Sequence, residues 1–146
     1  MDLSLHTDFG LRVLLYLAHF PDRRVGTQEI SRAYGISKNH LVRVVQTLAQ
    51  AGFVRAHPGR GGGVSLARPP NKILLGDVVR ACEPNFRLVE CFEQESNRCP
   101  IVPGCGLKSP LRNALQAFFL ELDRYTLADL VRTDSTSKFV QLVGAG

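Results

Sequence analysis

The stretch from Thr27 to Leu66, TQEISRAYGISKNHLVRVVQTLAQAGFVRAHPGRGGGVSL, decides the fold. Thr27 opens a short helical segment that Gly35 ends, and Ser37 is a good N-cap for a second helix. The buried stripe of that second helix is expected to hold Leu41, Val44, Val45 and Leu48, which recur at helical spacing. Gly52 then ends the helix as a C-cap glycine. The order predicts two helices joined by a glycine-containing turn.

A glycine-rich hairpin follows these two helices. Residues 53–56 have the character of a short strand, and residues 64–66 alternate as a return strand. Residues 57–63 between them include four glycines, so we expect a turn there. Helix, turn, helix and hairpin in this order predict a mainly α protein, a winged helix-turn-helix with a small β-hairpin wing.

Polar and basic side chains gather where this unit would face double-stranded DNA. We expect DNA contacts from the second helix and the wing, at Ser37, Lys38, Asn39, His40, Arg43, Arg55, His57 and Arg60. Such side chains contact phosphates and base edges in the major groove. The alternative is a small helical core with a solvated basic face and a loose hairpin. The ordered run of caps and helix breakers favours the DNA-binding unit.

The overall composition agrees with a nucleic-acid-binding protein. The chain of 146 residues has a formal net charge of +5 and a pI of about 9.3, which favours a polyanionic partner. A hydrophobic content of 45% is enough for one packed domain with an appended element. No apolar run approaches the roughly 20 residues that span a bilayer, and no secretory signal is recognisable. We therefore expect a cytoplasmic protein that does not enter the membrane.

Two further helices complete the predicted DNA-binding domain. Thr7 can cap a first helix that carries an apolar stripe and that Pro21 and Asp22 close. Another amphipathic helix is expected over residues 73–83, after the paired prolines at 69 and 70. The domain is thus predicted to cover residues 1–83.

Three cysteines lie close together in a loop predicted at residues 84–109. Cys91, Cys99 and Cys105 have the spacing C-x7-C-x5-C. Structural disulfides are disfavoured in a reducing compartment, and thiolates are the usual ligands of iron–sulfur clusters. A zinc site more often uses two CxxC-like pairs, which this chain lacks. The alternative is three ordinary thiols. No histidine lies in the loop, so a fourth ligand must come from elsewhere in the chain, a partner subunit or solvent.

The fourth cysteine has a different setting. Cys82 lies in an apolar helix register beside Val78 and Val79. A buried, small hydrophobic role is therefore favoured over metal ligation for Cys82.

A long last helix is predicted at residues 110–132, with a flexible tail at 133–146. Its apolar residues have heptad-like spacing: Leu111, Leu115, Phe118, Leu122 and Tyr125. This stripe either packs on its own domain or joins two chains. Because helix-turn-helix proteins commonly bind paired half-sites, we favour a homodimer on an inverted-repeat operator.

With these motifs the chain resembles the winged-helix iron–sulfur transcriptional regulators, and most of all their nitric-oxide-sensing branch. The resemblance covers residues 1–132. It rests on TDFGLR at 7–12, SKNHL at 37–41, GRGGG at 59–63 and YTLADLV at 125–131, together with the three loop cysteines.

The resemblance implies a homodimeric repressor that senses nitric oxide and releases operator DNA when its cluster is nitrosylated. It implies cluster ligation by Cys91, Cys99 and Cys105, with Asp8 completing a [4Fe-4S] site across the dimer. From the residues alone, Asp8 is only a carboxylate favoured at a helix start. Another branch has a histidine where this chain has Lys108, which argues against a [2Fe-2S] site with an imidazole ligand, although [2Fe-2S] stays possible.

Two alternatives stay open. One is a regulator of the same fold that senses iron–sulfur status or oxidative stress through a cluster, thiols or zinc. The other is a small iron–sulfur electron carrier or redox enzyme. The DNA-binding unit, the missing fourth loop cysteine and the lack of a catalytic pair or dinucleotide motif argue against an enzyme.

Overall fold

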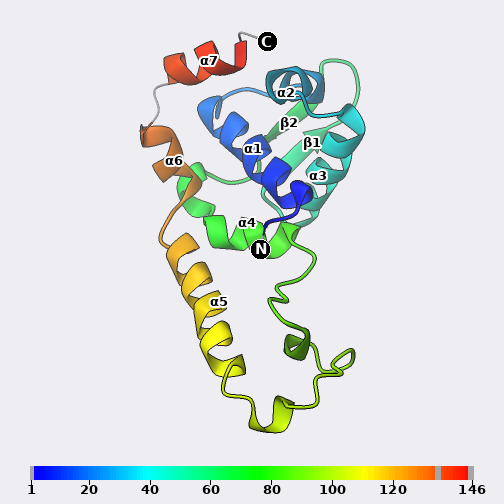
Figure 1. Cartoon of the computed structure of the whole chain (residues 1–146). Coiled ribbons are helices and arrows are strands. Elements are labelled where there is room, and N and C mark those ends of the chain that lie inside the picture. Colours follow the sequence, from blue (N-terminus) through cyan, green and yellow to red (C-terminus); the bar gives the residue numbers. More distant parts are fainter. Residues whose placement is uncertain (1, 134–135, 145–146) are drawn as a thin grey trace.

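The computed structural model describes residues 2–133 and 136–144, and it is mainly helical with one small β-hairpin that lies beside α1 and α3 (Figure 1). The predicted DNA-binding domain contains α1 (Leu5–His19), α2 (Thr27–Tyr34), α3 (Lys38–Gln50), β1 (Val54–His57), β2 (Gly63–Leu66) and α4 (Leu75–Cys82). A 3-10 turn, Pro70–Lys72, leads from the hairpin to α4. This arrangement confirms the predicted winged helix-turn-helix fold.

The helix ends follow local capping chemistry. Ser37 caps α3, as predicted, by accepting a hydrogen bond from the backbone N–H of His40 at 3.3 Å. Gly35 has φ +64° and so ends α2 in the left-handed conformation that favours glycine. The predicted cap of α1 was one turn late, because Ser4 rather than Thr7 accepts the capping bond.

The wing is an antiparallel hairpin that is tied to the helical core. Val54 lies opposite Leu66, and His57 opposite Gly63. A β-bridge between Val25 and Val64 joins the hairpin to the segment before α2. At the tip, a Cβ on Gly62 would collide with the carbonyl oxygen of His57, so the turn needs glycine at that position.

The core lies where α1 contacts α3, α4, α6 (Leu127–Thr133) and the hairpin. Its fully buried side chains come from several elements and include Leu14, Leu17, Ile30, Leu41, Leu48, Ile73 and Leu127. Burying one such side chain contributes about 1.5–3 kcal/mol. The four residues predicted for the stripe of α3 are all among the buried ones.

The cysteine loop follows α4 and contains two short 3-10 turns, Glu90–Phe92 and Val102–Gly104. It leads into α5 (Lys108–Leu122), which extends away from the DNA-binding domain (Figure 1). The far end of α5 returns to the domain: the backbone of Tyr125 accepts a hydrogen bond from Leu75, and Leu127 donates one to Ile73, at 3.0 and 2.8 Å.

The C-terminal region differs from the sequence-based expectation. The single helix predicted for residues 110–132 is divided into α5 and α6 (Leu127–Thr133), because a turn separates them. Thr126 and Asp129 form reciprocal hydrogen bonds that start α6 anew. Residues predicted as a flexible tail form α7 (Thr136–Gly144), while 134–135 and 145–146 lie outside the described residues.

None of the helices within residues 2–133 and 136–144 combines the length and the apolar character that a bilayer crossing requires.

Candidate DNA interface and cysteine loop

The start of α3 presents the side chains predicted to contact DNA. Ser37, Lys38, Asn39, His40 and Arg43 are all exposed, while the opposite face of α3 is buried. Ser37 to His40 precede Leu41, the first buried residue of α3, and Arg43 lies between Leu41 and Val44 on the exposed side of the helix. A polar and basic surface at a helix N-terminus suits phosphate and base contacts.

The wing adds a second basic surface. Arg55 and Arg60 are exposed, and Arg60 lies in the glycine turn at the tip. Neither of these arginines has an ion pair in the part of the chain that the structure describes. His57 differs, because it is part-buried and its Nε2 lies 2.8 Å from the hydroxyl of Ser65. The structure therefore gives His57 a role within the hairpin.

α3 is also held from behind by α1. Nε2 of His6 lies 3.0 Å from the hydroxyl of Thr47, and the ring of Phe9 packs near that of His40. These contacts fix the orientation of α3 on the domain. The sequence pattern gave no signal for these contacts, because they join residues that are far apart in the chain: His6 and Thr47 are 41 positions apart.

The three loop cysteines have the chemistry of cluster ligands. Cys91, Cys99 and Cys105 are free thiols, and each is partly exposed. Three unpaired thiols on one irregular loop fit an iron–sulfur cluster as a donor set. Within the described residues of this one chain, however, no three His, Cys, Asp or Glu side chains gather into a metal-binding group. The structure thus places the cysteines on one loop without bringing them together.

Asp8 is not placed with the cysteines either. Its carboxylate pairs with Arg12 one turn later on α1, at 2.6 Å, and both side chains are partly exposed. The pair occupies the first half of α1, which the helix dipole makes favourable for a carboxylate. Asp8 is therefore accessible at the surface, as ligation across a dimer would require.

Cys82 is clearly distinct from the other three. It is buried, and its sulfur packs closely against Gly10 of α1. Burial, with a smaller contribution from the nearby Glu83 carboxylate, raises the pKa of the Cys82 thiol to about 11. A protonated, enclosed thiol is a poor metal ligand, which agrees with the predicted buried role.

Glu83 is a residue that the sequence analysis missed. Its carboxylate accepts hydrogen bonds from the backbone N–H and hydroxyl of Ser4, both at 3.0 Å, and from the hydroxyl of Thr7 at 2.5 Å. Burial alone would raise its pKa, but these hydrogen bonds from Thr7 and Ser4 lower it overall. Glu83 thus links the residue just before the cysteine loop to the start of α1.

The apolar residues of α5 are either half-buried or exposed within one chain. Phe119 packs edge-on against Phe86 and under the guanidinium of Arg80, which also pairs with Asp123. No residue of α5 is fully buried, and the four stripe residues that lie in α5 are half-buried: Leu111, Leu115, Phe118 and Leu122. One face of α5 therefore packs on its own domain, and the stripe is only partly covered within one chain.

An exposed, basic recognition helix beside a β-hairpin wing defines this chain as a winged helix-turn-helix DNA-binding regulator. The profile of the Rrf2 family, described as an iron-dependent transcriptional regulator, matches residues 3–133. The chain belongs to this family.

Individual relatives agree with that assignment. The HTH-type transcriptional regulator NsrR of Bacillus subtilis (strain 168) is 47% identical over 133 residues, which cover 90% of this chain and 91% of the relative. The structure of T. potens IscR superimposes with a TM-score of 0.74 at 25% identity, covering 94% of this chain and 90% of that one. CymR, the global cysteine regulator of B. subtilis, matches with a TM-score of 0.69 at 26% identity, covering 92% and 99%.

Proposed function

We propose that the chain is a homodimeric cytoplasmic repressor that binds an inverted-repeat operator and releases it in response to nitric oxide. The observation that carries the proposal is the combination of an exposed polar and basic surface on α3 and the wing with three free thiols on one loop. The 47% identity to NsrR over most of the chain supports the same function.

In this proposal the DNA contacts come from the start of α3 and the wing. Lys38, Asn39 and Arg43 enter the major groove, and Arg55 and Arg60 contact the phosphate backbone beside it. Two copies are needed to cover two half-sites. The partly covered stripe on α5 supports α5 as the surface between the copies, because half-exposed apolar side chains favour burial against a partner.

The proposed cluster ligands are Cys91, Cys99, Cys105 and Asp8 of the partner subunit, with [4Fe-4S] preferred over [2Fe-2S]. When bound, an iron–sulfur cluster supplies iron atoms that react with nitric oxide. The chain's own residues connect this loop to the rest of the molecule. Glu83 joins its beginning to α1, α1 holds α3 through His6 and Thr47, and α5 continues from its end.

One experiment tests the whole proposal. Anaerobically purified protein, the same protein without iron, and the nitric-oxide-treated protein are compared for operator binding at fixed salt. We expect tight binding for the first and a large loss of affinity for the third. Full operator affinity after nitric oxide treatment would overturn the proposed signal.

A second candidate is a regulator of the same fold that responds through its thiols or a bound zinc. The favouring observation is that the three cysteines are free and not gathered within one chain. Iron and acid-labile sulfide analysis of the anaerobic protein separates the two candidates. Stoichiometric iron and sulfide support the cluster, whereas zinc or no metal supports the second candidate.

A further inference from the structure

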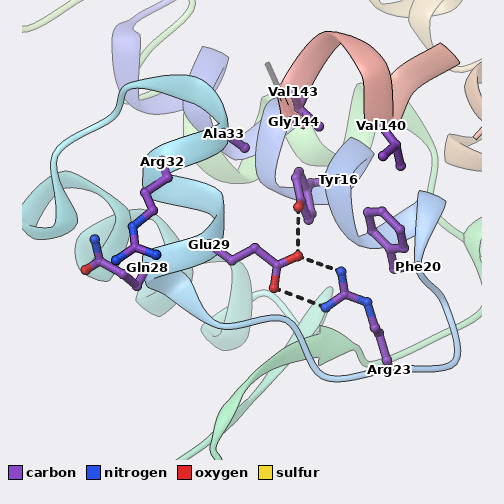
Figure 2. Close-up of a pocket in the computed structure, with 10 residues that line it drawn as sticks. All are labelled: Tyr16, Phe20, Arg23, Gln28, Glu29, Arg32, Ala33, Val140, Val143 and Gly144. Carbon is purple, nitrogen blue, oxygen red and sulfur yellow. Dashed lines mark hydrogen bonds and ion pairs between the residues drawn. The ribbon is translucent and has the colours of Figure 1, made fainter. Parts of the chain in front are cut away.

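A pocket of about 580 Å³ lies between α1, α2 and α7 (Figure 2). It shares no residue with the proposed DNA interface or the cysteine loop. Its main lining side chains are Tyr16, Phe20, Glu29, Arg32, Val140 and Val143. This volume is in the range of small-molecule sites in proteins.

The wall that α7 contributes is anchored on the core. Phe139 is 8% exposed, and its ring stacks on that of His19 with a centroid distance of 3.9 Å. The same ring meets Tyr16 edge-on at 5.6 Å. Packing of this aromatic cluster holds Val140 and Val143 opposite α2.

The acidic group of the pocket is neutralised within the wall. Glu29 accepts hydrogen bonds from the hydroxyl of Tyr16 at 2.7 Å and from both terminal nitrogens of Arg23 at 3.1 and 2.5 Å. The hydrogen bond from Arg23 is the main cause that lowers the pKa of Glu29. Burial, and next the hydrogen bond to Glu29, raise the pKa of Tyr16 to about 12. At neutral pH the pocket therefore contains a closed Tyr16–Glu29–Arg23 network.

Arg32 is left as the uncompensated charge. The lining includes one acid, Glu29, and two bases, Arg23 and Arg32, so its formal charge is +1. The side chain of Arg32 is exposed and forms no ion pair or side-chain hydrogen bond with any described residue. In Figure 2, Gln28 and Arg32 lie together on one side of Glu29, whereas Val140 and Phe20 lie on the other side of it. The pocket is thus cationic on one side and apolar on the other.

We propose that this pocket binds a small organic anion, with its carboxylate at Arg32 and Gln28 and its apolar part against Val140 and Val143. Such a ligand spans the space between α2 and α7. α2 is also bonded to the turn before α3, because the hydroxyl of Ser31 donates to the carbonyl of Ile36 at 2.7 Å. An occupant therefore acts on the helix that positions the DNA-binding helix, independently of the cysteine loop.

Hexanoate is a suitable probe, with hexan-1-ol as its uncharged counterpart. Each is titrated into the full chain by calorimetry at constant ionic strength, and hydrogen exchange of the backbone is followed by mass spectrometry. We expect saturable binding of one hexanoate per chain, at least tenfold weaker binding of the alcohol, and slower exchange in α2 and α7.

Arg32→Gln is the decisive variant, and Lys72→Gln on the 3-10 turn before α4 is its control. Both residues are exposed, so neither change should lower the unfolding temperature. We expect Arg32→Gln to weaken hexanoate binding about tenfold and Lys72→Gln to leave it unchanged. Equal affinity of Arg32→Gln and the unchanged protein, protection confined to α5, or no saturable binding would each overturn the proposal.

Discussion

At the scale of single residues, the four cysteines divide into two chemical groups. Cys82 is enclosed by α1 and α4 with a raised thiol pKa, whereas Cys91, Cys99 and Cys105 reach the surface. Alkylation requires an accessible thiolate. The two groups should therefore differ in their rate of reaction with iodoacetamide.

We predict that the iron-free, reduced, folded chain takes up three iodoacetamide groups quickly and a fourth only after unfolding. Mass spectrometry of the labelled peptides at pH 8 identifies the slow site as Cys82. A Cys82→Ala variant is the control, since it should show only the fast phase. Rapid labelling of Cys82 in the folded chain would contradict its buried role.

Glu83 carries a second prediction at this scale. Glu83→Ala removes the acceptor for Ser4 and Thr7, so we expect a loss of about 1–3 kcal/mol in the free energy of unfolding at pH 7. Glu95→Ala, an exposed change in the cysteine loop, should cost less than about 0.5 kcal/mol. Urea unfolding followed by circular dichroism measures both.

The effect of Glu83 should depend on pH in a defined direction. Because its pKa is lower in the folded chain, the carboxylate stabilises the fold above its unfolded pKa of about 4.3. That contribution is lost as the pH falls through the folded pKa. The stability difference between the unchanged protein and Glu83→Ala should thus be constant from pH 7 to 5 and shrink below about pH 4. A difference that grows on acidification would contradict the assignment.

At the scale of elements, the wing offers a test of how DNA is held. Arg60 lies at the tip of the hairpin without an ion pair among the residues the structure describes. We predict that Arg60→Gln weakens binding of all DNA sequences to a similar degree and reduces the salt slope of log K by about 1. Arg132→Gln on α6 is the matched control. Fluorescence anisotropy at several salt concentrations measures the slopes, and an unchanged slope for Arg60→Gln would exclude a phosphate contact.

The helices and the wing of the DNA-binding domain could be predicted because their signals are local. Ser37, Gly35 and the glycines of the turn act on their immediate neighbours. The break between α5 and α6 was missed although Thr126 and Asp129 form a recognisable capping pair, because the apolar spacing continues through it. α7 was missed because its placement depends on Phe139 meeting His19, a contact between distant parts of the chain.

At the scale of the whole molecule, α5 determines the proposed assembly. We predict that Leu115→Glu converts the dimer to a monomer without unfolding the domain, since no residue of α5 is buried in one chain. Gln116→Glu is the control: Gln116 is exposed and follows Leu115 in α5, so this change should leave the dimer intact. Sedimentation velocity gives the mass, and circular dichroism gives the melting temperature. A monomeric Leu115→Glu protein should also bind the operator far more weakly, whereas a dimeric one would place the interface elsewhere.

The candidate site could be predicted in part. The loop cysteines and the basic residues of α3 are visible as types and spacings. The bond from Glu83 to Ser4 spans 79 positions, and the Tyr16–Glu29–Arg23 network joins three separate segments. No sequence pattern reports such pairings. The joint binding of one cluster by the three cysteines stays a prediction, because their side chains do not lie together among the described residues of a single chain.

Because only its C-terminal end is fixed to the domain, α5 can tilt as a rigid arm. Tyr125, Leu127 and Asp123 fix its C-terminal end to the domain, while its N-terminal end carries the cysteine loop. A helix of 15 residues is about 22 Å long, so a tilt of about 5° at the fixed end moves the other end by about 2 Å. Conversely, a displacement of the cysteine loop by about 1 Å rotates α5 about its fixed end by only about 3°. In the proposed dimer, a rotation of a few degrees about α5 would therefore change the relative orientation of the two DNA-binding domains without repacking their cores.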